Sequence, residues 1–178
     1  MNTWVVLLRG VNVGGTGRLP MADLRAHIAA LGGHAPETYV QSGNAVFSGA
    51  VDPDAFSRSL SDRIAQHHGH TPRVLVLPAE TLIRALAAFP FAEARDRPKT
   101  GHVWFCAEDP VSPDLEGLAA VAGPRERFAL EGRWFFLDAP GGIGRSKLAA
   151  KVERSLGVAA TARNLNTVMA LERMAAAR

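Results

Sequence analysis

The sequence predicts an α+β protein made of two tandem split-βαβ units, and three observations support that prediction. Runs of strand length that are rich in apolar residues begin each half, at 3–8 and 102–107. Helical and strand-like patterns follow in the order β-α-β-β-α-β-α, and this order occurs twice. A polar stretch with two prolines, 90–100, separates the two sets of elements as a linker. Two ferredoxin-like (alpha-beta plait) halves, over residues 1–90 and 100–178, are therefore expected to pack together.

The first half is expected to contain four strands and three helices. Thr3–Leu8 is apolar throughout, which is typical of a central strand buried on both faces. Pro20 can open a helix at its first position, and Asp52 is a suitable cap for a second helix. The remaining expected elements are strands at 38–41, 44–48 and 73–77 and a closing helix marked by Leu82, Leu86 and Phe89.

The second half repeats this order. A strand at 102–107 precedes a helix whose apolar residues stand at 115, 118 and 121. The two-residue turn Glu131-Gly132 joins strands at 127–130 and 133–137, as in a β-hairpin. Ser146–Leu156 is expected to form a helix, followed by a short strand at 158–161 and a terminal helix at 164–177.

The composition is that of an ordinary globular protein, with 47% hydrophobic and 21% charged residues. The apolar N-terminal run stops at Arg9, which is too short for a secretory signal, and no run reaches the roughly 20 apolar residues of a membrane span. The single cysteine, Cys106, has no partner for an internal disulfide. These features favour the cytoplasm and argue against a membrane partner.

The positive charge is concentrated at the C-terminal end. Residues 145–178 carry seven Lys or Arg against two Glu, whereas residues 1–144 have a small negative balance. A basic segment of this kind can contact nucleic acid or an anionic ligand. An equally simple explanation is a solvated helix face in a sequence rich in Arg and Ala.

A Gly-rich loop, Arg9–Gly15, connects the first strand to the first helix. Its glycines allow positive φ angles and close approach of the backbone, so several N–H groups could converge on an anion. The spacing matches neither the dinucleotide fingerprint nor the P-loop, and a tight connection is the alternative explanation. The candidate ligand-binding residues in this loop are Arg9, Gly10, Asn12, Gly14 and Gly15.

A second Gly-rich segment leads into the helix expected at Ser146. Cations near a helix N-terminus oppose the helix dipole unless an anion lies between them. The sequence therefore predicts an anion site here, with a solvated basic face as the alternative. Its candidate residues are Gly144, Arg145, Ser146 and Lys147.

Two polar segments are further candidates. Gln41, Ser42 and Asn44 form, with Gly43, a turn that could also present hydrogen-bonding groups. The segment with Arg163, Asn164 and Asn166 precedes the last helix. There an asparagine is expected first as an N-cap, and the alternative is a site for a phosphate and a base edge.

No pattern in the sequence identifies a reaction, a cofactor or a metal. Ser42 and Ser146 have no recognisable His/Asp partners, and no nucleophile elbow occurs. The tract His67–His70 resembles a metal-binding segment but lacks nearby Cys or carboxylate ligands, so surface histidines are expected. Cys106 lies in an apolar strand, which favours a buried structural thiol.

Five motifs spread over the chain resemble a bacterial family catalogued as a domain of unknown function, number 1697. They are LLRGVNVGG (7–15), LPMADL (19–24), TYVQSGNAVF (38–47), GIGRSKL (142–148) and TARNLNTV (161–168). The resemblance implies two ferredoxin-like halves and no established activity, substrate or cofactor. The last motif of the family usually has an aromatic residue where this chain has Leu165, so a ring that could stack on a base or cofactor is missing here.

Three functional hypotheses follow from the sequence. The first is binding of a phosphorylated or anionic small molecule by Gly-rich and basic loops of both halves. The second is nucleic-acid binding through the basic C-terminal segment, although the strands lack the aromatic pattern of RNA-recognition sheets. The third is a self-associating or partner-binding protein without chemistry, since edge strands can pair between chains.

Overall fold

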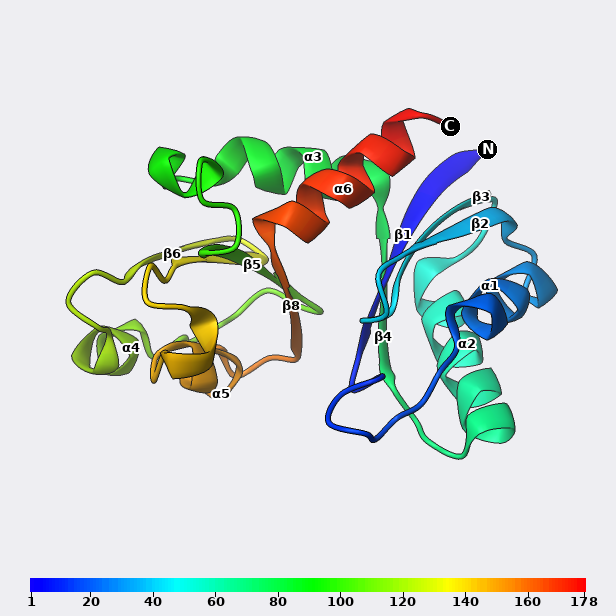
Figure 1. Ribbon diagram of the computed structural model, residues 1–178, viewed down its shortest axis with the longest axis horizontal. Helices are drawn as coiled ribbons and strands as arrows, with labels where there is room; N and C mark the ends of the chain where they lie inside the picture. The colour runs from blue at the N-terminus through cyan, green and yellow to red at the C-terminus, as the bar shows by residue number, and fades with distance from the viewer. The chain divides into compact units, whose positions relative to one another are not determined.

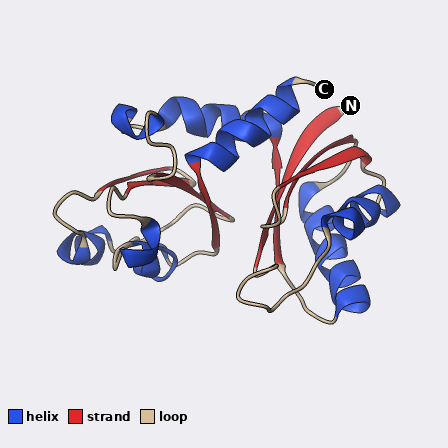
Figure 2. Cartoon of the chain, viewed as in Figure 1, coloured by secondary structure: helices blue, strands red, loops and turns tan.

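The computed structural model describes residues 1–178 and divides them into two compact units. Unit 1 comprises residues 1–84 and 169–178, and unit 2 comprises residues 85–168. Each unit is built on a four-stranded sheet, and Figures 1 and 2 show a pair of helical segments covering one face of each sheet. None of the helices combines the length and apolar character needed to cross a bilayer.

Unit 1 has a β-α-β-β-α-β core whose strands lie in the order β2-β3-β1-β4, and every neighbouring pair is antiparallel. Its elements are β1 (Asn2–Arg9), α1 (Met21–Ala30), β2 (His34–Tyr39), β3 (Asn44–Gly49), α2 (Pro53–His68) and β4 (Arg73–Pro78), followed by α3 (Ala79–Ala88).

The core of unit 1 follows from the alternation of strand residues and the helical spacing of apolar side chains. Alternate residues of β1, including Val6 and Leu8, pack with Phe47 of β3 against apolar side chains of α1 and α2. The Asp52 carboxylate accepts a hydrogen bond from the Ala55 N–H at 2.7 Å and caps α2, as expected from the sequence.

Unit 2 repeats this topology with the strand order β6-β7-β5-β8, again entirely antiparallel. Its elements are the 3₁₀ turn η1 (Ala92–Arg95), β5 (Gly101–Cys106), α4 (Leu115–Val121), β6 (Arg127–Glu131), β7 (Trp134–Asp138), η2 (Ile143–Arg145), η3 (Ala149–Lys151), α5 (Val152–Leu156) and β8 (Ala160–Asn164). The last helix, α6 (Leu165–Ala176), begins in this unit.

This architecture confirms the predicted α+β class with two tandem ferredoxin-like units. The order of elements occurs twice, and a two-residue hairpin turn joins β6 to β7 as expected. It lies at Gly132-Arg133 instead of Glu131-Gly132, because Glu131 still belongs to β6 and pairs with Trp134. The segment expected as a linker, 90–100, instead contains η1 and belongs to unit 2, where Ala94 is fully buried.

Three elements differ clearly from their predicted bounds. Strand β8 covers Ala160–Asn164 instead of 158–161. Strand β2 covers His34–Tyr39 instead of 38–41, because Val40 has a φ of +50° that turns the chain out of the extended conformation. The helix expected from Ser146 becomes an α-helix only at Val152. Before that point the Lys151 N–H donates to the Leu148 carbonyl at 2.8 Å, which closes a 3₁₀ turn instead of an α-helical one.

Candidate functional site

The Arg9–Gly15 loop folds into a small hairpin that continues to Gly17. The Asn12 N–H donates to the Gly17 carbonyl at 2.9 Å, and Val13 and Thr16 exchange hydrogen bonds of 3.2 and 2.9 Å. Gly14 and Gly15 both have positive φ angles, as a two-residue hairpin turn requires. The amides of Asn12, Val13 and Thr16 therefore already have acceptors within the hairpin, which weakens the predicted convergence of N–H groups on an anion.

Asn12 joins this hairpin to its surroundings through its side chain. Its Nδ2 donates to the carbonyls of Leu19 and Gln41, each at 2.8 Å, and its Oδ1 accepts from the Leu19 N–H at 2.9 Å. The contact with Gln41 places the hairpin beside the turn between β2 and β3. The structure thus brings together two of the predicted segments, Arg9–Gly15 and Gln41–Asn44, and gives Asn12 a structural role.

The turn before β3 is held closely against the end of β1. The Leu8 N–H donates to the Gly43 carbonyl at 2.8 Å, and a Cβ atom added at Gly43 would lie 2.7 Å from both Leu8 Cβ and Val11 Cγ2. Asn44 is fully buried and its Nδ2 donates to the Tyr39 carbonyl at 3.1 Å. Of the turn residues 40–43, Val40, Gln41 and Ser42 are exposed.

The basic segment in unit 2 is arranged differently from the predicted helix N-terminus. Ser146 is buried, and its Oγ accepts a hydrogen bond from the Ala149 N–H at 2.9 Å, so it caps the 3₁₀ turn. Arg145 and Lys147 are exposed, and Gly144 precedes them in η2. The α-helix that follows has only five residues, so its dipole adds little to an anion site here.

The segment before α6 contains the expected cap. The Asn164 Oδ1 accepts a hydrogen bond from the Thr167 N–H at 3.0 Å, which confirms the N-cap prediction. Arg163 donates to the Ala162 carbonyl at 2.8 Å, and burial lowers the pKa of its guanidinium to about 10, so it stays charged at neutral pH. Leu165 is buried against Gly101, so its position faces the core and not a ligand; Asn166 is half-buried.

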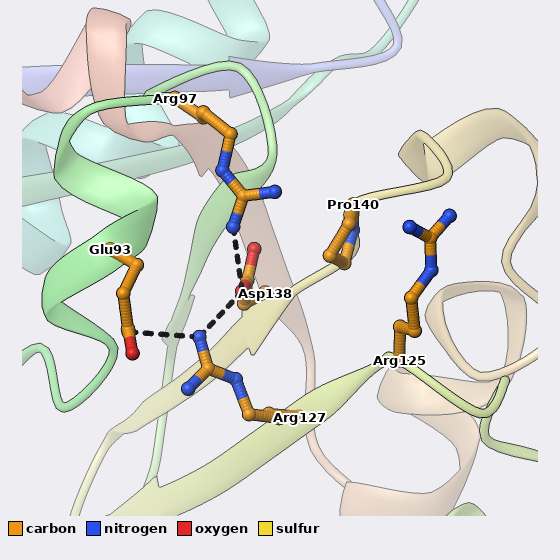
Figure 3. A pocket seen from close by; sticks show the side chains of 6 residues that line it. All are labelled: Glu93, Arg97, Arg125, Arg127, Asp138 and Pro140. Atoms are coloured by element: carbon orange, nitrogen blue, oxygen red, sulfur yellow. Dashed lines mark hydrogen bonds and ion pairs between the residues drawn. The ribbon is translucent and has the colours of Figure 1, made fainter.

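A hollow of about 240 Å³ in unit 2 concentrates charged side chains that the sequence did not single out (Figure 3). It lies where the ends of β6 and β7 meet the segment with η1. In Figure 3 dashed lines run from Asp138 to two arginines and from one of these arginines to Glu93. The lining residues are Glu93, Arg97, Arg125, Arg127, Asp138 and Pro140.

Asp138 is the fixed centre of this cluster. Its side chain is 1% exposed, and it accepts hydrogen bonds of 2.8 Å from both Thr100 Oγ1 and Arg127 Nη2. Arg97 lies 3.8 Å away as a second cation. A buried carboxylate is stable only when its oxygens are paired in this way. Asp138 therefore cannot leave Thr100 and Arg127 without a large cost in free energy.

Arg127 is held by three groups, which are two carboxylates and an aromatic ring. Besides Asp138, its Nη2 contacts the Glu93 carboxylate at 3.1 Å, and its guanidinium lies 4.9 Å from the centre of the Phe91 ring. The two carboxylates raise the pKa of Arg127 by hydrogen bonding. A hydrogen bond from its own backbone, followed by the contact with Arg127, lowers the pKa of Glu93.

Arg125 is the guanidinium in the hollow that has no acidic partner. It is exposed, no dashed line reaches it in Figure 3, and it makes no hydrogen bond or ion pair. Three arginines and two carboxylates leave the hollow with a formal charge of +1. Such an arrangement can attract and hold an anionic group, because arginine donates in a planar fork that matches carboxylate and phosphate oxygens.

Sequence reasoning missed this cluster because its members come from three separated segments. Arg97 lies in the stretch that was expected as a linker. Arg125 precedes β6, Arg127 is its first residue, and Asp138 is the last residue of β7. The register that places Arg127 opposite Asp138 is visible only after the sheet has formed. The one available signal was the concentration of arginines around the two prolines of 90–100 and before 127.

The histidines form a separate cluster in unit 1. His27 Nε2 and His68 Nε2 are 3.0 Å apart, and His68 lies 3.9 Å from Asp23. No group of three or more His, Cys, Asp or Glu side chains is placed to hold a metal ion. Cys106 is buried, and burial raises the pKa of its thiol to about 11, which makes it a poor nucleophile.

Comparison with known proteins gives a family and a fold. The family model described as a protein of unknown function, DUF1697, matches residues 1–136. Among solved structures, the conserved bacterial protein SP0830 from Streptococcus pneumoniae is 22% identical, with 98% of each chain covered and a TM-score of 0.73. At this identity the likeness shows the fold alone. No curated protein matches the sequence.

Proposed function

The chain belongs to the DUF1697 family of proteins of unknown function, and we propose that its second unit binds a phosphorylated or otherwise anionic small molecule in the hollow beside Asp138. The observation that carries this proposal is the excess of guanidinium groups over carboxylates in one hollow. Asp138 is buried and paired, Glu93 forms an ion pair with Arg127, and Arg125 has no acidic partner.

The rigidity of the surroundings supports the same proposal. Arg127 is the first residue of β6 and Asp138 the last of β7, and these two residues are direct cross-strand partners. The Thr100 hydroxyl donates a hydrogen bond to the second carboxylate oxygen of Asp138. The backbone carbonyl of Thr100 lies 3.1 Å from His102 Nδ1. An arginine oriented by a sheet, as Arg127 is, loses little freedom when an anion binds.

The predicted basic loop extends this site along the chain. Pro140 lines the hollow, and the segment that follows it leads within a few residues to Arg145 and Lys147, both exposed. We include Gly144–Lys147 as the part of the site that would contact the remainder of a larger ligand. The Arg9–Gly15 loop belongs to unit 1, and its own predicted role in anion binding is tested separately by Arg9→Ala.

The experiment is a thermal-shift screen of nucleotides, sugar phosphates and inorganic phosphate, followed by calorimetric titration of any compound that stabilises the protein. Arg125→Ala should abolish or weaken binding at least fivefold without lowering the melting temperature of the free protein, because Arg125 is exposed and makes no hydrogen bond or ion pair. Arg173→Ala, which removes an exposed charge from α6, is the matched control. No stabilisation by any compound, or equal binding by Arg125→Ala, would contradict the proposal.

A second candidate is nucleic-acid binding, favoured by another hollow in unit 2. This hollow, of about 340 Å³, is lined by Lys151 and Arg154 together with Asp114, Gly117 and Ser155. Neither Lys151 nor Arg154 has an ion-pair partner. Binding of single-stranded RNA or DNA that weakens steeply with added salt, and that is lost in a Lys151→Ala/Arg154→Ala variant, would favour this function over the first.

A further inference from the structure

Two carboxylates share one guanidinium in the hollow of unit 2, but they differ sharply in burial. Arg127 Nη2 lies 2.8 Å from Asp138, whose side chain is 1% exposed, and 3.1 Å from Glu93, whose side chain is 66% exposed. Ion pairs on the surface are weak because water solvates both partners well when they separate. Glu93 can therefore leave Arg127 easily, whereas Asp138 cannot.

The backbone that carries Glu93 is fixed even though its side chain is free to turn. The next residue, Ala94, is fully buried, and Arg95 donates a short hydrogen bond to the Leu86 carbonyl. Release of Arg127 therefore requires only a change of the Glu93 side-chain rotamer into solvent. No rearrangement of η1 is needed.

Resting on the proposed function, we propose that Glu93 is an internal competitor that occupies Arg127 in the empty hollow and is displaced by a dianionic ligand. When Glu93 turns away, three arginines and Asp138 leave a formal charge of +2. A phosphate monoester, which carries between −1.5 and −2 at pH 7, matches that charge. A monocarboxylate carries the same charge as the Glu93 side chain that it would displace. The exchange therefore adds little binding free energy.

The test uses sulfate as a dianion and acetate as a monoanion, titrated at constant ionic strength into the full-length protein. Sulfate is expected to bind more tightly than acetate. Glu93→Gln should tighten sulfate binding about two- to fivefold, the range that corresponds to the loss of a competing surface ion pair. Glu131→Gln removes the same charge from the far end of β6 and should change the affinity less than 1.5-fold.

A second measurement does not depend on a variant. In the wild-type protein the pKa of the Glu93 carboxyl is lowered, in part by Arg127. Saturation with sulfate should raise that pKa, because Arg127 then faces the sulfate. Carbon-detected NMR of the side-chain carboxyl reports this shift directly, and an unchanged pKa in the sulfate-saturated protein would show that Glu93 stays in place.

The outcomes separate the two proposals. If neither sulfate nor acetate binds the wild type or Glu93→Gln, the proposed function itself is wrong. If sulfate binds and Arg125→Ala loses it, but Glu93→Gln behaves like Glu131→Gln, the site stands and the competitor role is overturned. Weaker sulfate binding by Glu93→Gln would overturn it as well, because Glu93 would then orient Arg127 for the ligand.

Discussion

The side chain of Asn12 donates to the main-chain oxygen of Gln41 at 2.8 Å and thereby couples the hairpin after β1 to the turn before β3. The same side chain also exchanges two hydrogen bonds with the backbone of Leu19. Asn12 has a φ of +52°, a left-handed conformation that asparagine tolerates better than most residues. Residue type, backbone conformation and hydrogen bonding thus agree at this position.

Asn12→Ala is expected to destabilise the protein by about 1–3 kcal/mol, because it removes three hydrogen bonds and leaves an alanine in the left-handed region. Asn12→Gly keeps the conformation accessible and loses only the hydrogen bonds, so its effect should be smaller. Urea denaturation measures both. Asn2→Ala, at the exposed start of β1, serves as the control, and equal stability of Asn12→Ala and Asn2→Ala would contradict this account.

Gly43 should be sensitive to a single added methyl group. A Cβ atom there would lie 2.7 Å from both Leu8 and Val11, and the φ of +78° is also unfavourable for alanine. Gly43→Ala should therefore cost about 1–3 kcal/mol for overpacking in addition to about 1 kcal/mol for the conformation.

Gly14→Ala is the matched comparison, since Gly14 has a φ of +57° but no atom within 4 Å of an added Cβ. It should show the conformational cost alone. Thermal or urea denaturation of both variants measures the extra destabilisation that overpacking causes at Gly43. A Gly43→Ala variant no less stable than Gly14→Ala would mean that Leu8 and Val11 move aside freely.

The sequence was sufficient for the fold because the fold depends on local periodicity. Apolar runs, caps such as Asp52 and the hairpin signal at Gly132 all lie within a few residues, and they place most elements to within one or two positions. The start of α5 was mispredicted because Leu148, Val152 and Leu156 have the same spacing in a continuous helix as in a 3₁₀ turn that leads into a short one. The arginine hollow was not predictable, because a cross-strand register and a folded linker assemble it.

Asp138 is expected to stabilise unit 2 by fixing β6, β7 and the 97–100 turn to one another. Asp138→Asn keeps an acceptor for Thr100 but removes the charge that binds Arg127 and Arg97, so we expect a loss of about 1.5–3 kcal/mol in the free energy of unfolding. Asp109→Asn removes a carboxylate that pairs with Arg133 at 3.2 Å on the exposed surface. That control should change stability by less than about 1 kcal/mol, and a similar loss in both variants would show that burial of Asp138 does not matter.

The histidine cluster predicts that the protein loses stability in mild acid. The Arg63 Nε–H donates to His27 Nδ1 at 3.2 Å, so that nitrogen must be unprotonated, and the proton of neutral His27 lies on Nε2. This Nε2–H then donates to His68 Nε2 at 3.0 Å. A second proton on His27 would oppose the Arg63 donor directly.

Burial lowers the pKa of His27 below 6.5, and the nearby His68, His67 and Arg63 lower it further, while Asp23 opposes them. The unfolded chain therefore binds a proton at His27 more readily than the folded protein does. The stability that neutral His27 contributes is complete above pH 6.5 and declines as the pH falls from there toward the lowered pKa. Urea denaturation at pH 8.0 and 5.5 measures the decline. His27→Gln should reduce this decline in stability, whereas His34→Gln, at an exposed position, should leave the decline unchanged. The same pH dependence in His27→Gln and the wild type would rule out His27 as the origin of the decline.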